Sequence, residues 1–179
     1  DWQALLHDPK TPLINKSISG QYPPGSTFKM AVALAALESG LITADHKVKC
    51  YGKMRLGRHD FHCWKRHGHG ELDMVGAIAH SCDIFFYDIA RKIGIERIGE
   101  TARMLGFGAP LGLLLPGEKS GLIPTPEWKM ALQGVPWQQG ETLITGIGQG
   151  FVLSTPLQLA VLTARIANGG YAVVPRLTR

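Results

Sequence analysis

Residues 22–29 read Tyr-Pro-Pro-Gly-Ser-Thr-Phe-Lys and lead directly into the apolar run 30–37. The prolines and the glycine interrupt any helix that comes from upstream, and the alanine-rich sequence after them favours a new helix. The pattern therefore predicts a helix over 26–39 with Ser26 and Lys29 in its first turn. Residues three apart share a helix face, so the Ser26 hydroxyl and the Lys29 amine are expected to meet.

A serine and a lysine in this arrangement can support covalent catalysis. A serine hydroxyl is a poor nucleophile unless a nearby base accepts its proton, and burial favours the neutral form of a lysine that can do so. By itself, however, a Ser-x-x-Lys spacing is better explained by a serine that caps a helix and a lysine that faces solvent. The rest of the chain distinguishes the two interpretations.

Two further motifs follow along the chain. Ser81-Cys82-Asp83 stands directly before the apolar run 84–90, and Gly146-Ile147-Gly148-Gln149-Gly150 precedes a predicted helix over 156–168. Together with residues 15–40, these segments resemble the transpeptidase domain of class B penicillin-binding proteins, whose first two motifs are Ser-x-x-Lys and Ser-x-Asn or Ser-x-Asp. The matches occur in the family's order and cover nearly the whole chain.

The form of the second motif narrows the resemblance. Its Ser-x-Asp version, with Trp64-Lys65 and Gly68-His69-Gly70 ahead of it, is most similar to the elongation-specific group of the family, penicillin-binding protein 2. The third family motif, Lys-Thr-Gly on a strand, is expected beyond Arg179. We therefore interpret residues 1–179 as a partial transpeptidase domain, with the membrane anchor, the non-catalytic pedestal and the C-terminal part outside these residues.

The resemblance implies an α+β fold, the penicillin-binding protein and serine β-lactamase-like transpeptidase fold. This chain should form a helix-rich part of it that lacks most of the central antiparallel sheet. The periodicity predicts helices over 26–39, 74–80, 84–93, 95–105 and 156–168, and strands over 47–55 and 171–175. The glycine- and proline-rich stretch 106–140 predicts an ordered loop with short helical turns.

The resemblance also assigns roles to four residues. Ser26 would attack the carbonyl between the two D-alanines of a peptidoglycan stem peptide, release the terminal D-alanine and pass the acyl group to the amine of a second stem. Lys29 would be the base, Ser81 would relay a proton, and Asp83 would fix Lys29 and the substrate amide. β-Lactam antibiotics would acylate the same serine, and no cofactor is needed for this chemistry. Two alternatives stay open, a β-lactamase-like serine hydrolase and a non-catalytic penicillin-binding sensor domain.

Partners and location are implied in the same way. A membrane glycan polymerase and elongation scaffold proteins would bind the parent protein at the periplasmic face of the bacterial inner membrane. The net charge of +5 is modest, and no nucleic-acid fold signature accompanies the basic side chains. We therefore expect no nucleic-acid partner, and interpret the cluster Arg55, Arg58, Lys65 and Arg66 as a solvated face or a surface suited to an anionic cell-wall polymer.

Three cysteines make an odd count in a domain expected to face an oxidising compartment. They are Cys50, Cys63 and Cys82, and His69 lies between two glycines where the backbone can turn sharply. A structural zinc site formed by these four residues would account for the odd count, with His67 as the substitute ligand. Two alternatives stay open: a Cys50–Cys63 disulfide with Cys82 buried, or three unconnected thiols.

Overall fold

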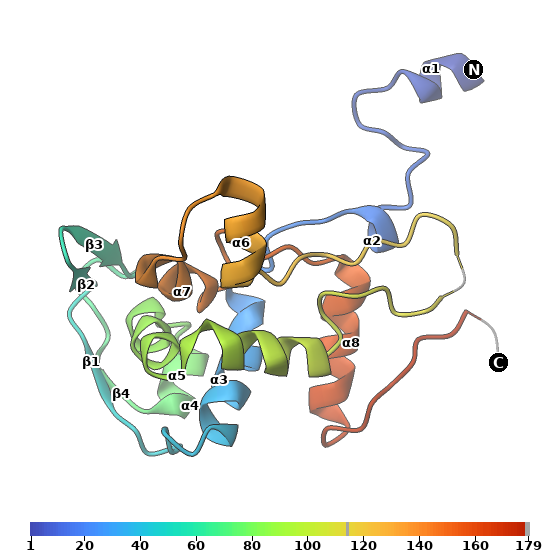
Figure 1. Cartoon of the computed structure of the whole chain (residues 1–179). Helices are drawn as coiled ribbons and strands as arrows, with labels where there is room; N and C mark the ends of the chain where they lie inside the picture. The colour runs from blue at the N-terminus through green and yellow to red at the C-terminus, as the bar shows by residue number, and fades with distance from the viewer. Residues whose placement is uncertain (114, 178–179) are drawn as a thin grey trace.

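The computed structural model describes residues 1–113 and 115–177, and two helices form its centre (Figure 1). Helix α3 (Lys29–Glu38) follows directly on a 3-10 turn, η1 (Gly25–Phe28), and packs against the long helix α5 (Asp83–Met104). The buried residues of α3 are mostly alanines, small side chains that let neighbouring backbones approach closely. Phe28, directly before α3, is fully buried, and its ring makes an edge-to-face contact with the Phe107 ring, with the ring centres 5.4 Å apart.

Shorter elements surround this pair. They are α1 (Trp2–Leu6), α2 (Lys16–Ser19), β1 (Val48–Cys50), β2 (Lys53–Leu56), β3 (His59–His62), β4 (Gly70–Leu72), α4 (Met74–Ala79), α6 (Pro126–Gln133), α7 (Gln139–Thr145) and α8 (Pro156–Ala167). In Figure 1 the strands occupy one end of the molecule and α8 the other, and α1 lies at the end of an extended arm. None of the helices in the described part of the chain is long and apolar enough to cross a lipid bilayer.

The prediction of two helices over 84–93 and 95–105 is confirmed by a break inside α5. Gly94 has φ of 84° and ψ of 165°, which are not helical values, so the element is two helical segments joined at this glycine. The predicted helices 74–80 and 156–168 also form, and each ends one residue earlier than expected. The helix predicted over 26–39 forms as η1 followed directly by α3, over 25–38. The first turn of the 26–39 helix is 3-10 rather than α.

The strands differ more from the prediction. Two antiparallel pairs form, β1 with β4 and β2 with β3, where one continuous strand over 47–55 was expected. A turn at Gly52, with φ of 89°, divides that segment into β1 and β2. The predicted strand over 171–175 is wrong: these residues have no regular structure, because no strand in the described ranges pairs with them.

The stretch 106–140 was expected to be a loop with short turns, and part of it is more regular than that. Helix α6 begins with Thr125 as its cap and a proline in its first turn, and it ends at Gly134 in the left-handed conformation. Helix α7 begins within the last two residues of the same stretch. The buried Lys129 side chain joins these helices through a 2.6 Å ion pair with Glu141.

Candidate active site

The turn that carries Ser26 packs against the glycine-rich motif, residues 146–150. The Gly25 N–H donates a hydrogen bond of 2.8 Å to the Gly148 carbonyl. A Cβ atom at position 148 would lie 2.2 Å from the Gly25 carbonyl oxygen, so a side chain there would push the turn away. Gly148 also has φ of 70°, a conformation that glycine adopts without strain. The contact leaves Ser26 exposed at the start of the helical segment.

Lys29 lies behind Ser26 and is almost completely buried, with 4% of its side chain exposed. Its Nζ donates hydrogen bonds to Asp83 Oδ1 at 2.6 Å, to the Ser81 carbonyl at 2.9 Å and to Ser81 Oγ at 3.1 Å. The amine also stands 5.4 Å from the centre of the Phe86 ring. The buried amine is therefore fixed by three oxygens of the second motif.

Ser81 connects Lys29 to Ser26. Its hydroxyl donates to Ser26 Oγ at 2.9 Å while it accepts from Lys29 Nζ, which makes a continuous chain of three polar groups. Ser81 has φ of 49°, the left-handed region that a serine adopts at a cost of about 1–3 kcal/mol. The contact expected between Ser26 and Lys29 thus runs through the Ser81 hydroxyl. The four residues assigned catalytic roles lie together, and these roles stay a prediction.

Trp64 was given no role from the sequence, although it belongs to this site. Its backbone N–H donates to Asp83 Oδ2 at 2.9 Å, so both carboxylate oxygens of Asp83 are bonded. Its indole N–H donates to the His80 carbonyl at 3.1 Å and to the Ser81 carbonyl at 3.2 Å. The sequence held one signal for this placement. Trp64 follows Cys63 directly, so a metal site shared by Cys63 and Cys82 would bring Trp64 beside the second motif.

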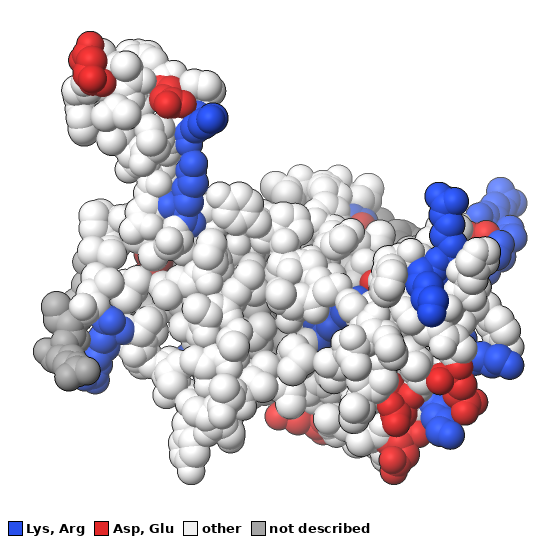
Figure 2. Space-filling view, turned by 180° about the vertical axis from the view of Figure 1, so that it is seen from behind, with Lys and Arg blue, Asp and Glu red and all other residues white. Residues whose placement is uncertain are grey.

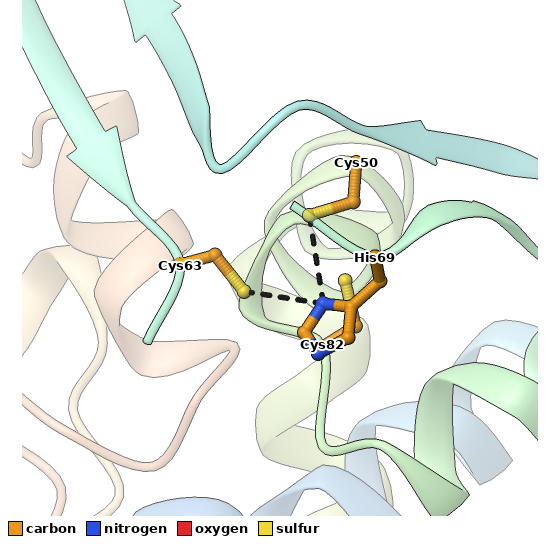
Figure 3. A group of neighbouring side chains, drawn as sticks. All are labelled: Cys50, Cys63, His69 and Cys82. Atoms are coloured by element: carbon orange, nitrogen blue, oxygen red, sulfur yellow. Dashed lines mark hydrogen bonds between the residues drawn. The ribbon is translucent and has the colours of Figure 1, made fainter. Parts of the chain in front are cut away.

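The cysteine and histidine cluster includes Cys82, the middle residue of the second motif (Figure 3). The ligand atoms of its four members all lie within 4.8 Å of one another; these residues are Cys50, Cys63, His69 and Cys82. The sulfurs of Cys50 and Cys63 each lie 3.6 Å from His69 Nδ1, and Figure 3 shows all four side chains pointing into one small space. His67, the substitute ligand, is exposed and outside this group.

Burial shifts the pKa values of two members of this cluster, Cys82 and His69. It raises the pKa of the Cys82 thiol to about 12, and the neighbouring Cys50 thiol adds to the effect. It lowers the pKa of His69, assisted by the positive charge of Lys65, so the imidazole stays neutral. All three cysteines are free thiols in the structure, and His69 Nε2 is buried with no hydrogen-bond partner among the described residues.

Comparison with protein families identifies the fold to which this site belongs. Residues 3–179 match the model of the penicillin binding protein transpeptidase domain. The chain belongs to this transpeptidase family. The resemblance inferred from the three motifs is thereby confirmed, and so is the expected fold, which is helix-rich with two small sheets in the described part of the chain.

Known transpeptidases add detail. The chain is 41% identical to the peptidoglycan D,D-transpeptidase MrdA of Acinetobacter baumannii over 181 residues, and it spans 27% of the length of that relative. The structure of Pseudomonas aeruginosa PBP2 in complex with WCK 5153 superimposes with a TM-score of 0.94 at 42% identity, over 98% of this chain and 39% of that one. This agreement confirms the similarity to the penicillin-binding protein 2 group.

Two solved assemblies also match this transpeptidase domain. Helicobacter pylori PBP2 in its complex with MreC gives a TM-score of 0.93 at 40% identity, over 98% of this chain and 33% of that one. A chain of a peptidoglycan synthase complex that coordinates polymerization and crosslinking gives a TM-score of 0.90 at 38% identity. The match covers 98% of this chain and 30% of the chain in that complex.

Proposed function

We propose that this chain is part of an elongation-type peptidoglycan D,D-transpeptidase that crosslinks stem peptides through an acyl-enzyme on Ser26. One observation carries the proposal: an exposed serine hydroxyl connects through Ser81 Oγ to a buried lysine, with bonds of 2.9 Å and 3.1 Å. Such a series of hydrogen-bonded groups can remove a proton from the serine as the serine oxygen attacks a carbonyl. The family membership of the chain supports the same function.

Each step of the reaction uses the hydrogen-bonded path from Ser26 through Ser81 to Lys29. Ser26 Oγ attacks the carbonyl of the penultimate D-alanine, and its proton passes through the Ser81 hydroxyl to Lys29, whose amine must be in its unprotonated form for this step. The same path returns the proton to the amide nitrogen of the terminal D-alanine, which leaves as its C–N bond breaks. The amine of a second stem then attacks the ester, gives up its proton along this path, and releases Ser26 as a free hydroxyl.

The oxyanion that forms in each attack also needs donors. The Ser26 backbone N–H, at the start of the helical segment, supplies one, and the positive end of the helix dipole favours negative charge at this place. As part of the proposal, the second donor and the Lys-Thr-Gly motif lie after Arg179 in the full-length protein. The A. baumannii relative, of which this chain spans 27%, is long enough to hold both.

The proposal extends to location and partners. The full-length protein would be anchored at the periplasmic face of the inner membrane, with an anchor and a pedestal before this domain. It would act on stem peptides, be acylated by β-lactams, and work with a membrane glycan polymerase and elongation scaffold proteins. The H. pylori complex with MreC and the synthase complex support partners of these two kinds.

The full-length protein tests this function directly. With a fluorescent penicillin, its intact mass should increase by one adduct, and with stem pentapeptides it should release D-alanine and form crosslinked dimers. Fast nitrocefin turnover would indicate a β-lactamase-like hydrolase instead. A single adduct without any D-alanine release or crosslinking would indicate a sensor domain.

We also propose that the cysteine and histidine cluster binds a structural zinc ion. Three thiols and one imidazole form a closed set of four ligands, one of the sets typical of structural zinc, and their ligand atoms already lie within 4.8 Å of one another. A metal bound at Nδ1 of His69 would leave the ring proton on Nε2. When bound, zinc would supply no chemistry to the reaction; it would hold Cys82, and with it Ser81 and Asp83, in place.

Removing this metal should lower stability and slow acylation together. We expect about one zinc per chain by elemental analysis, and a lower melting temperature after chelation, because binding energy at such a site contributes to folding. Cys82→Ser should reduce both zinc content and the rate of penicillin acylation, whereas His59→Ala, an exposed residue outside the cluster, should change neither.

Two outcomes would change this interpretation. Protein without zinc in which thiol counting finds a Cys50–Cys63 disulfide would replace the metal site by the disulfide. Zinc released by His67→Ala but not by His69→Ala would keep the site and exchange the histidine ligand.

A further inference from the structure

The excess positive charge of this chain lies in one segment. Residues 47–72, which carry all four strands, contain seven Lys or Arg and two Asp or Glu, a net charge of +5. The whole chain has the same net charge, so its remaining residues balance twelve basic side chains against twelve acidic ones. Figure 2 shows basic side chains gathered at the upper right, at the end of the molecule that carries β2 and β3. Charge concentrated in this way favours an anionic partner at this end.

A cleft of about 640 Å³ opens within the segment. Its walls carry two cations, Lys53 and Arg66, and two exposed aromatic rings, Tyr51 at 67% and Trp64 at 65% exposure. Its floor is backbone at Gly52, where a Cβ atom would lie 2.0 Å from the carbonyl oxygen of Arg66. The bend at Gly52 and the turn that carries Arg66 are thus in direct backbone contact at the cleft.

One wall of the cleft reaches the proposed proton path. The Trp64 indole N–H donates to the Ser81 carbonyl at 3.2 Å, and the Ser81 hydroxyl is bonded to Ser26 at 2.9 Å. An amine that attacks the acyl group on Ser26 must lose its proton to this path, so it must lie beside Ser81. The rest of the molecule that bears this amine can then extend over Trp64 into the cleft.

We propose that this cleft binds the acyl-acceptor stem peptide through a carboxylate held by Arg66. This inference rests on the function proposed above. Each stem ends in a D-alanine carboxylate, and an arginine binds such a group with two parallel hydrogen bonds. Lys53 is already paired with Asp60 at 3.1 Å, whereas the Arg66 guanidinium has no ion pair within the part of the chain that the structure describes. The exposed rings of Tyr51 and Trp64 supply a flat surface for the peptide backbone.

The test compares acceptor use with acylation in the full-length protein. Arg66→Ser should raise KM for an acceptor peptide with a free C-terminal carboxylate by about tenfold or more, since it removes both charge-assisted hydrogen bonds to that carboxylate. It should leave the rate of acylation by penicillin unchanged, and it should shift the products from crosslinked dimer towards hydrolysed donor. With a C-terminally amidated acceptor, wild type and variant should have the same KM, because no carboxylate remains to bind.

A matched control separates local binding from general attraction. Arg58→Ser removes the same charge from the turn between β2 and β3, outside the cleft, and should leave KM for the acceptor unchanged. An equal rise in KM in both variants, or with the amidated acceptor, would overturn the inference. So would a loss of binding to phosphatidylglycerol vesicles by Arg66→Ser with KM unchanged, which would assign the cleft to a lipid surface. A wild-type protein that penicillin does not acylate would instead refute the proposed function itself.

Discussion

In the full-length protein, Ser26→Ala should abolish the covalent β-lactam adduct that the wild-type protein acquires once per chain. The variant has no hydroxyl to form the ester, so we expect acylation to fall by about 10⁴-fold or more, the scale observed when a nucleophile is removed. Intact mass after exposure to a fluorescent penicillin measures this directly. Because Ser26 is exposed, the free energy of unfolding should change by no more than about 0.5 kcal/mol.

A control distinguishes this serine from others on the surface. Ser17→Ala removes an exposed hydroxyl from α2, away from the motifs, and should be labelled like wild type. An adduct that persists in Ser26→Ala would show that another residue is the nucleophile, and peptide mapping of that adduct would identify it.

The second large effect is expected at Lys29. Lys29→Arg keeps a positive charge opposite Asp83, but an arginine side chain stays protonated and cannot accept a proton from Ser81. We expect penicillin acylation to slow by about 10²–10⁴-fold, the contribution typical of a general base. Stopped-flow measurement of the adduct gives the rate. A wild-type rate in this variant would mean that Lys29 acts only through its charge.

A pair of further variants separates the chemical role of Lys29 from its contribution to stability. Lys29→Met leaves the buried Asp83 carboxylate without its 2.6 Å partner and should destabilise the protein by about 3–5 kcal/mol, as breaking a buried ion pair does. The double variant Lys29→Met/Asp83→Asn removes both charges, so its melting temperature should recover while acylation stays slow. Recovery of acylation in the double variant would exclude Lys29 as the base.

The sequence predicted those features whose signals are local. The helix after Ser26 has a glycine before it and an alanine-rich body, and the break in α5 lies at the glycine between two apolar runs. The four cysteine and histidine residues were grouped because their number and chemistry suggest a shared ion, and the structure brings their ligand atoms together. Residue type and spacing were sufficient in these cases.

Features that depend on distant parts of the chain were not predicted. Strand β4 was not predicted: it pairs with β1, some twenty residues earlier, and its three residues are too few to show a strand pattern of their own. The expected strand over 171–175 has the composition of a strand but no partner among the described residues. The role of Trp64 depends on three hydrogen bonds to residues beyond position 79, which spacing does not encode.

The separation of Ser26 and Ser81 along the chain, 55 residues, has a consequence for how the protein folds. Contacts between distant residues form late, since the entropy of closing the intervening loop opposes them until other contacts compensate. Helix α3 can form early from its own sequence, but Ser26, in the turn η1 before it, meets Ser81 only after the segment with the four strands has closed between them. Penicillin labelling during refolding should therefore follow completion of the native topology, well after the far-ultraviolet signal of the helices has appeared.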